Sequence, residues 1–221
     1  MSDRLRLCAV MRFSKTGPLR FVGHLDLARA VDRMVRRAGI PVAYTEGFNP
    51  RAKIAFAAPL PVGAASTSEL CVLDLSRAAE AAELARALCR ELPAGMELVE
   101  LAVRRRGRRS PIADLSRAGY ELRLSRHGVS EQDVAGAVAR VLAAADVQVL
   151  RRTKRGEQWV NVRPGILSLD YPAGDGDALH AVLHLGDGDI AKVDEVIAAL
   201  NAELGFEAAL TITGITRTSL Q

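Results

Sequence analysis

The chain has 221 residues, 49% hydrophobic and 25% charged, which is the composition of a globular protein and argues against a disordered chain. No apolar run reaches the roughly 18 uncharged residues of a membrane span, and Met1–Val10 lacks the apolar stretch of a signal peptide. Cys8, Cys71 and Cys89 lie far apart among apolar neighbours, which indicates reduced thiols in a core. We therefore expect a cytoplasmic protein without a membrane partner.

The first half of the chain predicts the element order βαββαβ. Apolar residues alternate with their neighbours from Leu5 to Phe13, as in a half-buried strand. Apolar residues then recur at helical spacing from about His24 to Ala38, and a glycine and a proline follow as a stop signal. The remaining predicted elements are strands over Ala52–Ala58 and Ser68–Leu75, a helix over Ala78–Leu92 and a strand over Glu97–Val103.

The same order returns in the second half. Its predicted elements are a strand over Tyr120–Ser125, a helix capped by Ser130 and running to about Ala145, a strand over Val147–Arg152, an irregular segment with a short strand, a strand over Ala178–Leu185, a helix over Ile190–Leu204 and a strand over Ala209–Thr216. Two such units predict an α+β protein with tandem ferredoxin-like βαββαβ domains and antiparallel sheets. The expected domains are residues 1–103 and 118–221, joined by an arginine-rich linker over 104–117.

Positive charge is concentrated in three segments. Residues 1–56 hold 11 Lys or Arg against 4 Asp or Glu, residues 104–126 hold 8 against 2, and residues 151–163 hold 5 against 1. The other segments are net negative, so the formal charge of the whole chain is only +4. If the basic segments converge after folding, they form a positive surface for RNA. If they stay dispersed, they are unevenly charged solvated surface.

The run from Phe21 to Gly63 contains most of the candidate functional residues. Of the four arginines in its predicted helix, Arg29, Arg33 and either Arg36 or Arg37 lie three or four residues apart and so form one face. This face is either solvated and partly neutralised by nearby acids, or a ridge whose guanidinium groups pair with phosphate oxygens. With the neighbouring cations and those of the third basic segment, the candidate phosphate-binding residues are Arg20, Arg29, Arg33, Arg36, Arg37, Arg51, Lys53, Lys154 and Arg163.

The string GFNP, residues 47–50, predicts a rigid loop. Its glycine tolerates positive φ, Asn49 closes an Asx-turn and its proline fixes φ. Phe48 fits either an anchor that pins the loop to the core or a surface on which an RNA base stacks, and the same alternatives hold for Tyr44. Trp159, the only tryptophan, is expected as a core anchor.

His24 is the one candidate catalytic residue. A histidine at a helix start can serve as general base toward a ribose 2′-OH in a metal-independent ribonuclease, but it also fits a structural anchor or an RNA contact. The three cysteines are too far apart in sequence to hold an iron–sulfur cluster, and no CxxC or close histidine pair indicates zinc. We therefore expect neither a metal nor a cofactor.

The same run carries a resemblance to the radical-SAM-linked protein family, a domain of unknown function fused to, or encoded beside, radical SAM proteins. The matching residues are His24–Asp26, Arg36, Arg37, Ala43, Tyr44, Gly47–Pro50 and Lys53, with a second stretch at Thr153, Lys154 and Val162–Pro164. The resemblance implies a radical SAM partner and a place near RNA processing and translation, and it brings no assigned catalytic residue. At the level of architecture, the chain also resembles the repeat-processing endoribonucleases of CRISPR systems, with His24 near the first helix.

The sequence thus predicts an RNA- or ribonucleoprotein-binding accessory protein that works with a radical SAM partner or the RNA-processing machinery. Whether it catalyses a reaction stays open, with a purely binding role as the first expectation. One alternative is a metal-independent endoribonuclease that uses His24. Another is a docking module whose arginines recognise an acidic protein surface without any RNA contact.

Overall fold

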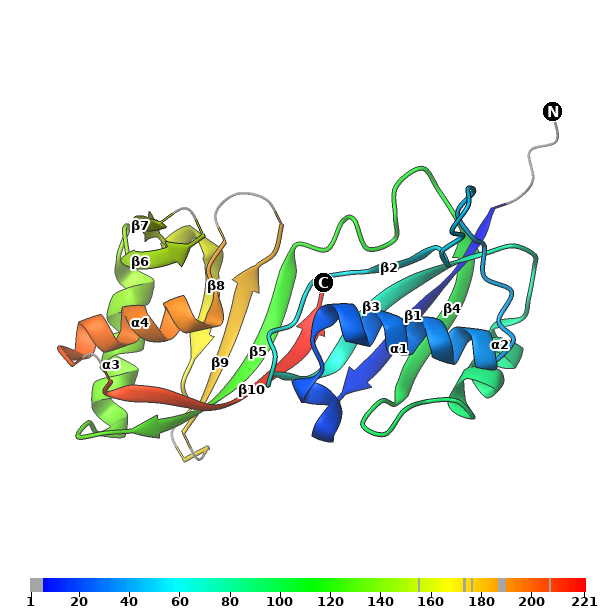
Figure 1. Ribbon diagram of the computed structural model, residues 1–221. Helices are drawn as coiled ribbons and strands as arrows, with labels where there is room; N and C mark the ends of the chain where they lie inside the picture. The colour runs from blue at the N-terminus through cyan, green and yellow to red at the C-terminus, as the bar shows by residue number, and fades with distance from the viewer. Residues whose placement is uncertain (1–5, 155, 173, 176, 187–189, 207) are drawn as a thin grey trace. The chain divides into compact units, whose positions relative to one another are not determined.

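The computed structural model describes residues 6–154, 156–172, 174–175, 177–186, 190–206 and 208–221 (Figure 1). The chain divides into two compact units, Met1–Leu115 with Leu220 (unit 1) and Ser116–Ser219 with Gln221 (unit 2). Both units mix helices with mostly antiparallel strands. Leu5, which the alternating pattern places in the first strand, lies outside the described residues. None of the helices within the described ranges has the length and apolar character needed to cross a membrane.

Unit 1 builds one sheet with two helices packed on it. Its elements are β1 (Leu7–Lys15), the 3-10 turn η1 (Gly17–Phe21), α1 (His24–Arg37), β2 (Ile54–Phe56), β3 (Ala65–Leu75), α2 (Ala81–Cys89) and β4 (Leu98–Arg105). The strands are ordered β4-β1-β3-β2, and each neighbouring pair is antiparallel. The predicted alternation in β1 is confirmed, because Ala9, Met11 and Phe13 are fully buried in a core shared with α1 and α2.

Two predicted elements of unit 1 are too long. The strand predicted over Ala52–Ala58 has ladder pairing only at Ile54–Phe56, and the helix predicted over Ala78–Leu92 spans Ala81–Cys89. The helix stops early because Pro93 disfavours helical backbone at the residue before it, and Arg90 already lies at the C-cap. In both cases apolar residues continue beyond the element, but the strand pairing and the helix do not.

Unit 2 contains the remaining helices and strands. Its elements are β5 (Arg117–Arg126), α3 (Glu131–Ala143), β6 (Gln148–Thr153), β7 (Gly156–Asn161), the 3-10 turn η2 (Arg163–Gly165), β8 (Ile166–Asp170), β9 (Ala178–His184), α4 (Val193–Leu204) and β10 (Leu210–Leu220). The main strands are ordered β10-β5-β9-β8. The predicted cap of α3 is confirmed: Ser130 Oγ accepts a hydrogen bond from the backbone of Asp133, and the Asp133 carboxylate accepts one from the backbone of Ser130.

The strand predicted over Val147–Arg152 is found as β6, and the segment after it contains a second strand, β7, that pairs with it as a hairpin. β6 and β7 pair antiparallel as a separate two-stranded sheet, with Leu150 opposite Trp159. The inner side of the hairpin packs on the core of unit 2 through Val149 and Val160. Arg151, on the same side, donates to both carboxylate oxygens of Glu195 in α4 at 2.6 and 2.8 Å. This buried ion pair fastens the hairpin to the helix.

Acid is expected to destabilise the fold. Burial raises the pKa of Glu195, but hydrogen bonds from Arg151 and the backbone of Lys192 outweigh it, so the net pKa is lowered. The hydrogen bond from Tyr171 likewise lowers the pKa of Asp177. A carboxyl with a lowered folded-state pKa contributes stability that is complete above its unfolded pKa of about 4 and is lost as the pH falls through the folded value.

We therefore expect the free energy of unfolding to decrease progressively below about pH 4.5. Urea titrations followed by circular dichroism between pH 7 and pH 3 measure it. A free energy of unfolding that stays constant over this range, or that rises toward pH 3, would contradict the expectation.

Candidate nucleic-acid-binding surface

Helix α1 separates an apolar face from a basic one. Its buried side chains, packed in the core of unit 1, are Leu27, Val31, Met34 and Val35. Arg29, Arg33 and Arg36 lie within about 60° of one another on a helical wheel of 100° per residue, on the solvent side. The sequence therefore places three guanidinium groups on one exposed helix face, as predicted from their spacing.

The arginines of α1 differ in how firmly they are held. Arg29 pairs with Asp26 at 2.8 Å and Arg36 with Asp32 at 3.0 Å, both on the exposed surface of the helix. For Arg33 the described part of the chain offers no ion pair. Exposed pairs of this kind are worth at most about 1 kcal/mol, so they hold the arginines only weakly.

Arg37 differs from the other arginines of α1 in pairing with a residue outside the helix. Its guanidinium Nε contacts the carboxylate of Glu91 at 2.8 Å, and Nη2 donates to the carbonyl of the same residue at 3.3 Å. Glu91 follows α2, so Arg37 joins the ends of the two helices. Its guanidinium is therefore used within unit 1, unlike that of Arg33 in the ranges that the structure describes.

The loop predicted from GFNP is closed by its own hydrogen bonds. Thr45 N donates to Arg51 O at 2.8 Å, and Arg51 N donates to Thr45 Oγ1 at 2.9 Å, which makes a narrow neck. Gly47 has a φ of +118°, a conformation that favours glycine. At the tip, Phe48 is fully exposed, at 106% of its reference area, and Asn49 is exposed beside it. The alternative in which Phe48 pins the loop to the core is thus wrong.

One contact joins the basic helix face to this loop. The Arg36 guanidinium lies over the ring of Tyr44, 5.5 Å from its centroid, and Tyr44 is 41% exposed. Tyr44 also forms an isolated bridge with Ala52 at the neck. We call Arg29, Arg33, Arg36, Tyr44 and Phe48 the helix–loop surface, because this contact joins the helix to the loop that carries Phe48.

The other predicted cations of unit 1 lie outside this region or at its margin. Ala52 and Ile54 pack against the core, so the alternation of an extended chain turns Arg51 and Lys53, both exposed, to the opposite side. Arg20 is exposed on η1 and stacks over Phe21, with its guanidinium carbon 4.6 Å from the ring centroid.

The predicted cations of unit 2 have separate environments. Arg163 is half-buried, and its guanidinium donates to the carbonyls of Leu142 and Ile166, at 2.9 Å from Nη2 and 2.8 Å from Nη1. It therefore caps the end of α3 and fixes η2 instead of offering donors to a ligand. Lys154 is exposed at the turn between β6 and β7.

His24 begins α1 with its ring packed edge-on against Phe56, centroids 5.5 Å apart at 80°. Phe56 in turn packs edge-on against the buried Phe13 at 6.5 Å. This aromatic series fastens the start of the helix to the sheet, so the geometry favours the anchor interpretation of His24. Its catalytic role stays a prediction.

Two sequence expectations about apolar residues are wrong. Trp159 is 69% exposed instead of anchoring a core, because the side of the hairpin that it shares with Leu150 faces solvent. Cys89 is exposed at the end of α2, whereas Cys8 and Cys71 are buried and burial raises the pKa of both thiols. Within the described ranges, no three His, Cys, Asp or Glu side chains gather as metal ligands would.

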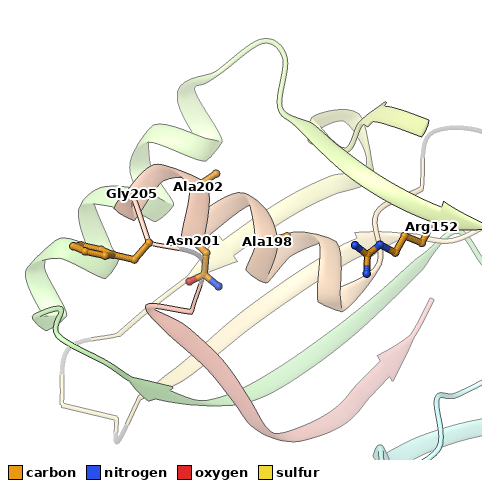
Figure 2. A pocket seen from close by; sticks show the side chains of 6 residues that line it. Arg152, Ala198, Asn201, Ala202 and Gly205 are labelled. Atoms are coloured by element: carbon orange, nitrogen blue, oxygen red, sulfur yellow. The ribbon is translucent and has the colours of Figure 1, made fainter. Parts of the chain in front are cut away.

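A pocket of unit 2 lies along the exposed side of α4 (Figure 2). Its lining residues are Arg152, Ala198, Asn201, Ala202, Gly205 and Phe206. The Asn201 amide donates to the carbonyl of Leu210 and accepts from its backbone N–H, so it is used within the fold. Arg152 is the ionisable side chain of this lining, and it pairs with Glu157 on the exposed surface at 2.9 Å.

A known protein family matches most of this chain. The model of the family described as "Uncharacterized protein conserved in bacteria (DUF2344)" matches residues 9–204. The chain belongs to this family. The matched range includes the helix–loop surface, the β6–β7 hairpin and the whole of α4. No curated protein matches the sequence.

Solved structures show likeness of fold. The chain is similar to a chain of the archaeal box H/ACA sRNP Nop10–Cbf5 complex, with 9% identity, a TM-score of 0.50 and coverage of 95% of this chain and 46% of that one. It is also similar to a chain of a Cbf5–Nop10–Gar1 complex, with 12% identity, a TM-score of 0.52 and coverage of 96% and 48%. An H/ACA RNP bound to a substrate RNA containing 2′-deoxyuridine gives 11% identity, a TM-score of 0.50 and coverage of 95% and 46%. The chain thus spans about half the length of the chains it matches.

Proposed function

We propose that this protein binds RNA through the helix–loop surface of unit 1. The observation that carries the proposal is Phe48, a fully exposed aromatic ring at the tip of a loop closed by hydrogen bonds. The Arg36–Tyr44 contact connects this loop to the basic face of α1. A stacking ring beside several guanidinium groups is the combination that unpaired nucleotides require.

Each part of the surface has a separate task in this binding. Arg33 and Arg36 donate paired N–H groups to phosphate oxygens, and the exposed carboxylate of Asp32 gives way to the phosphate. Phe48 offers both ring faces to a base. The loop is already ordered by Thr45 and Arg51, so little conformational entropy is lost when the base stacks.

The proposal extends to the architecture and to the partner. The antiparallel order β4-β1-β3-β2 in unit 1 and the order β10-β5-β9-β8 in unit 2 support tandem ferredoxin-like domains over 1–103 and 118–221 with a linker over 104–117, the β6–β7 hairpin being an insertion. RNA association is in keeping with the ribonucleoprotein complexes in which the similar folds were solved. Work with a radical SAM protein is the part of the proposal that rests on sequence resemblance alone.

Phe48→Ala is expected to weaken RNA binding by about 1–3 kcal/mol, because base–aromatic stacking has that magnitude in single-strand binding. The stability of the protein stays within about 0.5 kcal/mol of the unchanged chain, since Phe48 makes no buried contact. Fluorescence anisotropy with a labelled oligoribonucleotide measures the affinity, and thermal unfolding measures the stability.

Phe48→Tyr is the matched control and should keep most of the affinity, because it keeps the stacking ring. Val99→Ala removes another exposed apolar side chain of unit 1, on β4, and should leave RNA binding unchanged. Equal affinities for Phe48→Ala and the unchanged protein would remove the loop from the binding surface.

A further inference from the structure

We propose a second RNA-binding surface on unit 2, formed by Trp159, Arg152 and Phe206, that takes a single-stranded segment with bases on the two rings and a phosphate on the guanidinium. It rests on the proposed function, because it also requires the protein to bind RNA. Trp159 is 69% exposed and Phe206 63% exposed, so both rings are available for stacking. Neither ring belongs to the helix–loop surface.

The hairpin presents Trp159 from a fixed support. Directly opposed residues of an antiparallel pair point to the same side, so Trp159 shares the outer side with Leu150. The inner side is held by the core contacts of Val149 and by the ion pair of Arg151, which also donates to the carbonyl of Ile190 at 2.8 Å. The indole therefore faces solvent on a hairpin that is fixed to α4. No core contact among the described residues of unit 2 requires a tryptophan at this position.

Arg152 connects the hairpin to the pocket. It lies two residues beyond Leu150 in β6 and pairs with Glu157, which lies two residues before Trp159 in β7. It also lines the pocket to which Phe206 and the small exposed side chains of Ala198 and Ala202 belong. The surface thus continues from one aromatic ring, through a cation, to a second aromatic ring.

The chemistry of this surface favours RNA over a protein partner. Within the described residues of the hairpin, the exposed cations are Arg152 and Lys154, and the partner of Arg152, Glu157, is itself exposed. No carboxylate is part of the pocket lining in the described chain. Alternating rings and cations bind the bases and phosphates of single strands, and Arg152 is free to exchange its exposed partner for a phosphate.

The test uses the full-length protein and a fluorescein-labelled, mixed-sequence oligoribonucleotide of about 12 nucleotides, a length within the range of single-strand sites. Trp159 is the only tryptophan, so intrinsic fluorescence reports on this surface alone. We expect saturable quenching of tryptophan fluorescence as RNA is added. Trp159→Ala and Phe206→Ala should each raise the Kd, followed by anisotropy, by about fivefold or more.

Trp159→Phe should retain most of the affinity, and Leu167→Ala, which removes an exposed apolar side chain of β8, should change neither signal. RNA binding with unchanged tryptophan fluorescence and an unchanged Kd for Trp159→Ala would overturn this inference and leave the proposed function standing. Absence of RNA binding by the unchanged protein would overturn both. Loss of a bound protein, with RNA affinity intact, in Trp159→Ala would assign the surface to a protein partner instead.

Discussion

Replacing Arg33 and Arg36 together by glutamate is expected to weaken RNA binding by about 100-fold or more. Hydrogen bonds to charged groups contribute about 1.5–3 kcal/mol each, and the substitutions replace two such donors by carboxylates that repel phosphate. The slope of log Kd against log salt should also fall, by about one for each phosphate contact removed. Anisotropy titrations at several salt concentrations measure both quantities.

A matched control separates this effect from a general change of charge. Arg77→Glu with Arg86→Glu alters the net charge by the same amount at exposed positions of unit 1 outside the helix–loop surface. This control should keep the affinity within a few-fold of the unchanged protein. If both double variants lose affinity equally, binding follows the net charge of the protein and not the face of α1.

The double substitution itself should leave the fold intact. Arg33 has no ion pair with any residue that the structure describes, and the Arg36–Asp32 pair is exposed. Loss of such a pair, with a like-charge neighbour in its place, costs at most about 1 kcal/mol. Circular dichroism of the variant should therefore match that of the unchanged protein.

Glu195→Ala is expected to have the largest effect on stability, about 3 kcal/mol or more. The Glu195 side chain is only 5% exposed and accepts two hydrogen bonds from Arg151, whose side chain is 17% exposed. Removing the carboxylate leaves a guanidinium that is largely withdrawn from water without its counter-charge, a loss typically of about 3–5 kcal/mol. Denaturant unfolding followed by Trp159 fluorescence measures it.

The neighbouring residue of β6 supplies the control. Arg152 pairs with Glu157 on the outer side of the same hairpin, where the side chains are 82% and 54% exposed. Glu157→Ala should cost less than about 1 kcal/mol, because water solvates both charges. Similar losses for Glu195→Ala and Glu157→Ala would show that the inner ion pair does not fasten the hairpin.

Local patterns in the sequence predict the regular elements well. The alternation that ends at Phe13 is found in β1, the helical spacing after His24 is found in α1, and Ser130 caps α3. These elements are decided by side-chain periodicity and by turn residues close in sequence. The spacing of Arg29, Arg33 and Arg36 was sufficient to predict their common face, because a helix alone places residues three or four apart on one side.

Features that depend on tertiary contacts were not predictable. Arg163 looked like a phosphate-binding cation, yet its donors are used by carbonyls from distant parts of the chain. Trp159 was predicted as a core residue because large apolar side chains are usually buried. It is exposed because the side of the hairpin that it shares with Leu150 faces solvent. The Arg36–Tyr44 contact joins a helix to a loop and has no local signature.

Photo-crosslinking of bound RNA to the purified protein, followed by mass spectrometry of the crosslinked peptides, tests RNA binding by the helix–loop surface most directly. Phe48 and Tyr44 are the exposed aromatic residues of that surface, and a stacked base reacts with the ring beside it. We predict crosslinks at Phe48 or Tyr44 that disappear when Arg33 and Arg36 are replaced by glutamate. Crosslinks confined to other parts of the chain, or unaffected by that double substitution, would contradict the account.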